Sequence, residues 1–287
     1  MIKSILVPAS SETFDDAVLE TALWVAQPAA GHIELRYFCK PLPAGAKGLR
    51  QAGWAVGGAV APALALVDDE IERQSRGARA TFAEVCRRKG VALVDGLVRS
   101  TSVTATWHSA RDDLANLVYH ARHADLIVMG RPGSNNGFAR SHIELVLAGS
   151  GRPVLIAPTR ARPSISGTAF VCWKETPEAA RTVGAALPLL ANAQRVVLVN
   201  VDEGVGQSEL ALRAVARQLA RHGIDAEIRL LPRNKPVPEA LAAAADAHEA
   251  DLIVLGAYGH SKARELVFGG CTRAFLDSAS VPVLMMH

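Results

Sequence analysis

The sequence has little of what marks several specialised classes of protein. Its 287 residues include four cysteines, far apart and without a CxxC pair, so neither a disulfide framework nor a zinc site is expected. These cysteines are Cys39, Cys86, Cys172 and Cys271. No hydrophobic run reaches membrane-spanning length. The opening residues, MIKSILVPAS, lack the apolar core and cleavage site of a signal peptide. We therefore expect a cytoplasmic protein with reduced thiols.

An excess of charge is also missing, and so are the common catalytic motifs. The 31 basic and 28 acidic residues are dispersed along the chain and leave a net charge of +3, so we expect no nucleic-acid partner and no membrane partner. The patterns GxSxG, HExxH and GxxxxGK[ST] do not occur. We therefore predict no catalytic residues, no metal site and no enzyme activity, with weak ATP hydrolysis left as an open alternative.

What the sequence does contain is a regular alternation of strand-like and helix-like segments. With 49% hydrophobic residues the chain can fill a core, and the alternation predicts an α/β fold built from right-handed βαβ units. In the first half, strands are expected at Ile2–Pro8, His32–Phe38, Val91–Val98, Asp125–Met129 and Pro153–Ala157, and helices at Phe14–Ala26, Leu64–Lys89, Ser109–His123 and Ser141–Leu147. In the second half, strands are expected at Ala169–Trp173, Arg195–Val201, Ile224–Leu230, Asp251–Leu255 and Pro282–Met286, and helices at Pro177–Leu190, Ser208–His222, Pro238–Ala250 and Cys271–Ala279.

The two halves repeat each other. DLIVMGRPG at Asp125–Gly133 matches DLIVLGAYG at Asp251–Gly259, and GRPVLIAP near the end of the first half matches SVPVLMMH at the end of the chain. We predict two domains, residues 1–158 and 167–287, joined by the polar linker Thr159–Ser166. The first half is longer, chiefly through an insert at about residues 39–60. This insert is either a surface loop or a lid anchored by Trp54.

Four glycines follow the buried strand of the second copy and suggest a phosphate-binding loop. Gly256 and Gly259 end the strand, and Gly269 and Gly270 precede the last helix. Glycines so placed let backbone N–H groups approach an anion, and the amino end of a helix adds a favourable dipole. The alternative is a tight turn that needs positive φ at Gly256 and Gly259 without any ligand.

The pattern Gly256-x2-Gly259-x9-Gly269, with the flanks DLIVLGAYGHS and VFGGCTRAFL, resembles the nucleotide-binding signature of the universal stress protein (UspA-like) family. The resemblance covers nearly the whole chain as two tandem copies. It implies two flavodoxin- or Rossmann-like domains, each a five-stranded parallel sheet in the order 3-2-1-4-5 with helices on both faces, and ATP at the carboxyl ends of the strands. It also implies a cytoplasmic stress-response protein that pairs its two domains within one chain or forms a homodimer.

The resemblance assigns a nucleotide site to the second copy, with ATP, alone or with Mg²⁺, as the ligand. The residues it assigns are Lys174, Val201, Leu255, Gly256, Gly259, His260, Ser261, Gly269, Gly270, Cys271 and Thr272. Two positions depart from the family pattern. Gly270 stands where the family often has Ser or Thr, although Thr272 could supply a hydroxyl. Lys174 stands where an Asp usually contacts the nucleotide, and a lysine can attract phosphate but cannot accept hydrogen bonds.

The first copy departs further. Its loop after Asp125–Met129 contains Arg131 and Pro132, and alignment along the loop puts Ile143 and Glu144 where the second copy has Gly269 and Gly270. A branched side chain and a carboxylate there would obstruct and repel a phosphate.

Ser10 occupies the position of the family's Asp in this first copy. We therefore predict a first half that packs and pairs, with Pro153–Ala157 and Pro282–Met286 as the pairing edges. A regulatory ATP-binding protein is the main hypothesis, and a nucleotide-free interaction scaffold of the same fold is the alternative.

Overall fold

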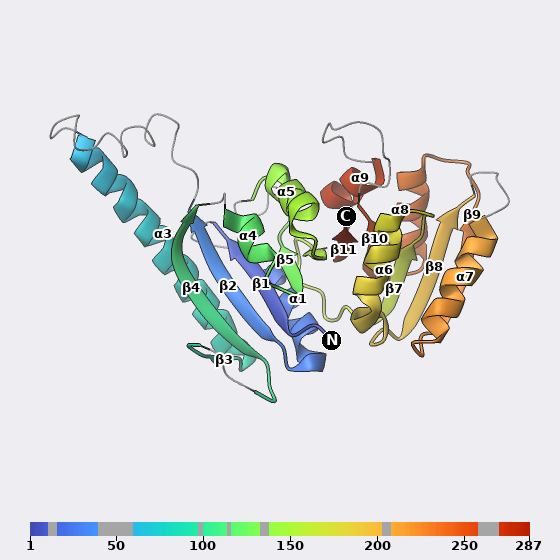
Figure 1. Ribbon diagram of the computed structural model, residues 1–287, viewed down its shortest axis with the longest axis horizontal. Helices are drawn as coiled ribbons and strands as arrows, with labels where there is room; N and C mark the ends of the chain where they lie inside the picture. Colours follow the sequence, from blue (N-terminus) through green and yellow to red (C-terminus); the bar gives the residue numbers. More distant parts are fainter. Residues whose placement is uncertain are drawn as a thin grey trace.

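The computed structural model describes residues 1–10, 16–39, 60–96, 100–113, 116–132, 138–202, 208–257 and 270–287. These residues form one 11-stranded sheet with helices on both faces (Figure 1). The part up to β6 is called the N-terminal half below, and the part from β7 onward is called the C-terminal half.

The N-terminal half contains six strands and four α-helices in the described residues. The strands are β1 (Ser4–Ala9), β2 (His32–Cys39), β3 (Ala92–Leu93), β4 (Thr104–Asp113), β5 (Leu126–Met129) and β6 (Val154–Ile156). The helices are α1 (Asp16–Ala26), α3 (Val60–Lys89), α4 (Leu117–Ala121) and α5 (Arg140–Ser150), with a short 3-10 helix, η1, at Gln27–Ala29.

The C-terminal half follows the expected order closely. Its strands are β7 (Thr168–Cys172), β8 (Arg195–Val201), β9 (Ala226–Leu231), β10 (Ala250–Gly256) and β11 (Val283–Met286). Its described helices are α6 (Pro177–Leu190), α7 (Ser208–Ala220), α8 (Val237–Ala247) and α9 (Gly270–Ser278).

Both halves have the predicted doubly wound topology. The strand order is β4-β2-β1-β5-β6 in the N-terminal half, with β3 outside β4, and β9-β8-β7-β10-β11 in the C-terminal half. Each order is 3-2-1-4-5, and the strands within each half are parallel. The prediction of an α/β fold with a mostly parallel sheet is therefore confirmed.

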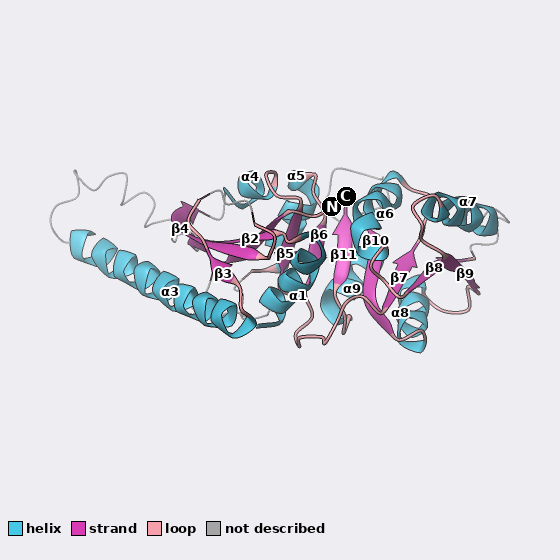
Figure 2. Ribbon diagram, turned by 90° about the horizontal axis from the view of Figure 1, so that it is seen from below, coloured by secondary structure: helices cyan, strands magenta, loops and turns pink. Residues whose placement is uncertain are grey.

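The two halves meet through their closing strands. β6 and β11 pair antiparallel, with Leu155 opposite Leu284, and Figure 2 shows the two strands side by side. Buried residues form one cluster on each face of the sheet, and both clusters contain residues of both halves. Leu155 and Leu284 belong to the cluster under α1, α3, α6 and α7, whereas Ile156 and Val283 belong to the cluster under α4, α5, α8 and α9. The hydrophobic core therefore continues across the junction.

The largest difference from the expected elements lies between β2 and β5. Within the described part of the strand expected at Val91–Val98, which ends at residue 96, Ala92–Leu93 is a strand, and the neighbour of β2 is β4. The helix expected over Ser109–His123 is wrong in its first part, because β4 continues to Asp113 and α4 spans only Leu117–Ala121. The polar sequence of β4, TATWHSARDD, does not look like a buried strand, but pairing with β2 along its length determines its conformation.

An aspartate holds the start of the first strand in each half. The Asp125 carboxylate accepts hydrogen bonds from the backbone N–H groups of Lys3 and Ser4, at 2.8 and 3.0 Å. Its repeat counterpart, Asp251, accepts one from the N–H of Thr168 at 3.0 Å and pairs with Arg162 at 2.8 Å. The repeat in sequence is thus also a repeat of hydrogen bonding.

The structure describes the linker between the two halves but not the insert. Residues 40–59, including Trp54, lie outside the described residues, so the choice between surface loop and lid stays open. The linker residue Arg162 accepts a hydrogen bond from the indole of Trp24, and Ile165 is buried in the core. Within the part of the chain described, no helix has the length and apolar character needed to cross a membrane.

Candidate functional site

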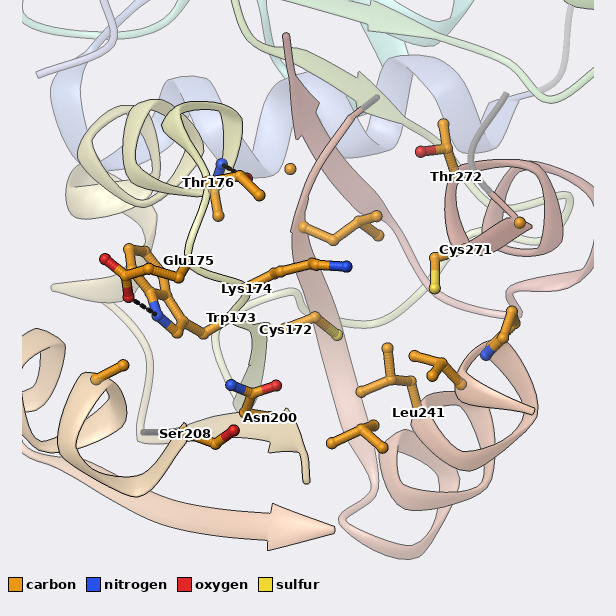
Figure 3. Close-up of a pocket in the computed structure, with 18 of the residues that line it drawn as sticks. Cys172, Trp173, Lys174, Glu175, Thr176, Asn200, Ser208, Leu241, Cys271 and Thr272 are labelled. Atoms are coloured by element: carbon orange, nitrogen blue, oxygen red, sulfur yellow. Dashed lines mark hydrogen bonds between the residues drawn. The ribbon is translucent and has the colours of Figure 1, made fainter. Parts of the chain in front are cut away.

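A cavity of about 910 Å³ opens in the C-terminal half at the carboxyl ends of β7, β8 and β10. Because β7 lies between β8 and β10, this is the point where the strand order reverses, which is where doubly wound sheets bind ligands. Figure 3 shows its side chains converging from both sides of the sheet. The cavity is lined by Cys172, Trp173, Lys174, Glu175, Thr176, Ala179, Asn200, Val201, Ser208, Leu210, Ala211, Val237, Pro238, Leu241, Leu255, Gly256, Gly270, Cys271 and Thr272.

Four helices begin at this cavity. Thr176 caps α6 by accepting a hydrogen bond from the N–H of Ala179, and Ser208, Val237 and Gly270 are the first residues of α7, α8 and α9. All four contribute to the lining. Each amino end carries a partial positive charge and free N–H groups, so together they favour an anionic ligand.

Seven of the residues assigned from the sequence line this one cavity. They are Lys174, Val201, Leu255, Gly256, Gly270, Cys271 and Thr272. The other four, Gly259, His260, Ser261 and Gly269, lie outside the described residues.

Gly256 is needed for close packing of a strand on a helix. A Cβ at this position would come within 2.6 Å of the backbone nitrogen of Ala179 and 2.9 Å of the carbonyl carbon of Glu178. Among the described glycines, positive φ occurs at Gly90, Gly96, Gly151 and Gly223, so the turn explanation does not apply to Gly256. The missing side chain lets the first turn of α6 lie directly against the end of β10.

Gly270 has space around it. Among the described residues, a Cβ there would meet only the ring of Pro238, at an ordinary contact distance of 3.7 Å. The hydroxyl that the family often has at this position is therefore absent without any steric need for a glycine. Thr272, the hydroxyl residue two positions on, lines the cavity and is buried.

Lys174 brings a positive charge to the α9 side of the cavity. Its side chain extends into the cavity in the direction of Cys271 (Figure 3). Burial raises the pKa of the Cys271 thiol, and the Lys174 ammonium opposes that rise, which shows that the two groups are electrostatically coupled. A cation beside the amino end of α9 suits a phosphate group.

The two cysteines of the cavity are in their thiol form. Burial raises the pKa of Cys172, and the neighbouring Cys271 adds to the rise. Because the thiolate is the reactive form, both thiols are poor nucleophiles and serve as small apolar groups in the wall.

Sequence reasoning missed several polar residues of the site. Asn200 lies at the end of β8 and lines the cavity, and the Trp173 indole donates to the Glu175 carboxylate at 3.3 Å. Asn200 interrupts an otherwise apolar strand, VVLVNV, directly before Val201, and this interruption was the signal available in the sequence.

The corresponding region of the N-terminal half is built differently. Strand pairing of Ile5 with Leu126, and of Ala169 with Leu252, supports the match of Ser10 to Lys174, and Ser10 is fully buried. The match of Glu144 to Gly270 is wrong. α5 begins at Arg140 whereas α9 begins at Gly270, because the connection from β5 to α5 is shorter than that from β10 to α9.

Ile143 therefore belongs to the first turns of α5 and is fully buried in the core. α5 begins Arg140-Ser141-His142 where α9 begins Gly270-Cys271-Thr272, so the start of α5 has no glycine.

With this geometry established, the chain can be compared with known proteins. Residues 190–287, which include β8 to β11 and most of the cavity lining, match the model of the universal stress protein family. This part of the chain is therefore similar in sequence to universal stress proteins. A universal stress protein of Synechocystis is 29% identical over 171 residues, covering 56% of this chain and 57% of the relative. The chain thus matches little more than half the length of that relative.

Solved universal stress proteins share the fold over the whole chain. A structure from Archaeoglobus fulgidus matches with a TM-score of 0.68 at 16% identity, covering 98% of this chain and 97% of that one. A putative universal stress protein from Pseudomonas aeruginosa matches with a TM-score of 0.56 at 17% identity, covering 99% and 93%. At these identities the similarity concerns the fold.

Proposed function

We propose that this chain is a universal stress protein that binds an adenine nucleotide, ATP in the simplest case, in the cavity of its C-terminal half. The observation that carries the proposal is that every described residue assigned from the family resemblance lines that one cavity. The ligand is regulatory rather than a substrate, and the protein acts as a cytoplasmic stress-response protein.

The composition of the cavity fits the two ends of a nucleotide. Val201, Leu241 and Leu255 offer an apolar surface for a base, and Asn200 can donate to and accept from its polar edge. The amino end of α9 and Lys174 offer positive charge for the phosphates. Lys174 makes this site differ from the family pattern, because it can bind phosphate but cannot accept the hydrogen bonds of an Asp. Mg²⁺, if it binds with ATP, would be held chiefly by the phosphates.

We infer one nucleotide per chain. The N-terminal half has Ser10 and Arg131 where the C-terminal half has Lys174 and Ala257, its α5 begins without a glycine, and it supports the other half by packing. The halves are proposed to be two tandem domains, residues 1–158 and 167–287, paired through β6 and β11. A homodimer of chains would extend this assembly.

Matched valine substitutions test the site. Gly259→Val should abolish ATP binding measured by titration calorimetry, because a branched side chain would fill the space that the phosphates need. Gly133→Val is the matched control at the repeat position of the N-terminal half and should leave the affinity unchanged. Unchanged affinity in Gly259→Val would contradict the proposal.

A nucleotide-free interaction scaffold is the second candidate, because the Asp and the hydroxyl of the family pattern are both replaced. Mass spectrometry of the protein as purified separates the two candidates. Adenine nucleotide released on denaturation supports a binding protein, and protein that neither carries nor takes up nucleotide supports a scaffold. Phosphate release from ATP and Mg²⁺ would reveal the less favoured ATPase.

A further inference from the structure

The N-terminal half contacts the nucleotide cavity indirectly, through a buried arginine. Arg131 follows β5, and its side chain crosses to the C-terminal half, where it donates to the carbonyl oxygens of Phe275, Leu276 and Val281 at 3.3, 3.2 and 3.3 Å. Only 5% of Arg131 is exposed. These carbonyls belong to the last turn of α9 and to the connection before β11.

α9 ends without the glycine that terminates its counterpart α5, and Arg131 donates to carbonyl oxygens in its last turn. Its counterpart α5 ends at Gly151, which has the left-handed conformation (φ 65°) typical of a glycine that terminates a helix. α9 is followed by Ala279 and Ser280 and has no basic residue in its last turn. The guanidinium of Arg131 supplies both the missing donors and the positive charge that favours the carboxyl end of a helix.

The charge of Asp277 increases the need for positive charge at the carboxyl end of α9. A carboxylate in the last turn of a helix lies at the negative end of the dipole and is unfavourable by itself. Asp277 forms an ion pair with Arg140 of α5. Burial lowers the pKa of Arg131, and the negative charge of Asp277 opposes that lowering. Two arginines of the N-terminal half therefore compensate the carboxyl end of α9.

The other end of the same helix forms the phosphate side of the cavity. Gly270, Cys271 and Thr272 are the first residues of α9 and line the cavity. A nine-residue helix that is fixed at its last turn has little freedom at its first turn. We propose that Arg131 is a positioning residue that holds α9 in the orientation required for ligand binding in the C-terminal half, and this inference rests on the proposed function.

The duplication explains how this could arise. Arg131 occupies the repeat position of Ala257, which is buried at the end of β10. The residue that follows β5 in one half thus contacts the carboxyl end of the helix whose amino end lines the cavity of the other half.

The test compares arginine variants in the full-length protein. Titration calorimetry with ATP should give a Kd about tenfold weaker for Arg131→Met, which keeps the volume of the side chain but removes the donors and the charge. Arg131→Lys should recover part of the loss, because it restores the charge but cannot reach all three carbonyls.

Arg162→Met is the matched control. Arg162 also pairs with a group of the C-terminal half, Asp251, and has a buried Nε without a hydrogen-bond partner, as Arg131 has. It lies at the amino end of β10, away from the cavity. The Arg162→Met substitution should lower the unfolding midpoint of the protein but leave its Kd for ATP unchanged. Wild-type affinity in Arg131→Met would overturn the inference.

Hydrogen exchange separates failure of this inference from failure of the proposed function. Arg131→Met should lose amide protection over Gly270–Ser278, whereas Arg162→Met should not. If the wild type itself does not bind ATP, the proposed function fails, and the exchange result alone decides whether Arg131 holds α9. Unchanged protection of α9 in Arg131→Met would overturn the inference in that case too.

Discussion

At the scale of single residues, the two glycines of the described cavity have different roles. Gly256 allows β10 to contact the backbone of α6, whereas a Cβ at Gly270 would make an ordinary contact with the ring of Pro238. A sequence pattern treats both as parts of one loop. Substitutions at the two positions should therefore have different kinds of effect, one on stability and one on ligand binding.

Gly256→Ala should destabilise the protein. The added methyl group would lie 2.6 Å from the nitrogen of Ala179, so the first turn of α6 must move. Such overpacking costs about 1–3 kcal/mol of unfolding free energy, which urea denaturation can measure. Gly184→Ala is the control: apart from the neighbouring backbone of α6 itself, no described atom lies within 4 Å of its Cβ position, and alanine there should stabilise by about 0.5–1 kcal/mol. Equal effects of the two substitutions would contradict this account.

Gly270→Ser should strengthen nucleotide binding. The side chain fits beside Pro238 and restores the hydroxyl that the family often has at the start of α9. One additional hydrogen bond of about 1 kcal/mol would lower the Kd for ATP by about fivefold. Gly270→Ala, which adds the methylene without the hydroxyl, should bind like the wild type. A weaker Kd in the serine variant would show that the phosphates do not lie at this end of α9.

At the scale of elements, the sequence predicts best where strands are apolar and buried. The expected strand Arg195–Val201 and helix Pro177–Leu190 agree with β8 and α6 residue for residue. β4 was missed because a polar strand near the edge of a sheet is determined by its neighbours rather than by its own pattern. The sequence comparison also gave the loop before α5 the same length as the loop before α9, although it is shorter. The glycines matched between the two copies do not reveal a deletion within the loop.

The repeated aspartate is an element-scale feature that can be tested. Asp125→Ala should cost about 1–3 kcal/mol of unfolding free energy, because two backbone N–H groups at the start of β1 lose their partner. Asp251→Ala should have a similar cost through Thr168 and Arg162. Asp225→Ala is an exposed control and should change stability by less than about 0.5 kcal/mol. The interpretation fails if the control and the two test variants are equally stable.

At the scale of the whole molecule, the junction of β6 and β11 makes one sheet out of two similar halves. Both hydrophobic clusters cross it, so each half covers an edge strand of the other. Topology and the choice of pairing strands were accessible from the sequence, because the duplication marks both closing strands. The contact of Arg131 with α9 was not, since it joins residues more than a hundred positions apart and uses a residue that the repeat does not share.

A fragment spanning residues 167–287 should self-associate. Without the N-terminal half, the hydrophobic edge of β11 would be exposed, and such edges pair with other strands. Analytical ultracentrifugation should find dimers or larger species at concentrations where β11 of the full chain is covered by β6. A fragment that stays folded and monomeric would show that the junction contributes little to covering this edge.

The central claim is that one half of this protein binds an adenine nucleotide while the other half supports it. The stoichiometry of ATP binding to the full chain, measured by equilibrium dialysis with labelled ATP, tests this claim most directly. The account predicts one ATP per chain at saturation. No bound ATP would contradict the proposed function, and two per chain would contradict the proposal that the N-terminal half has lost its site.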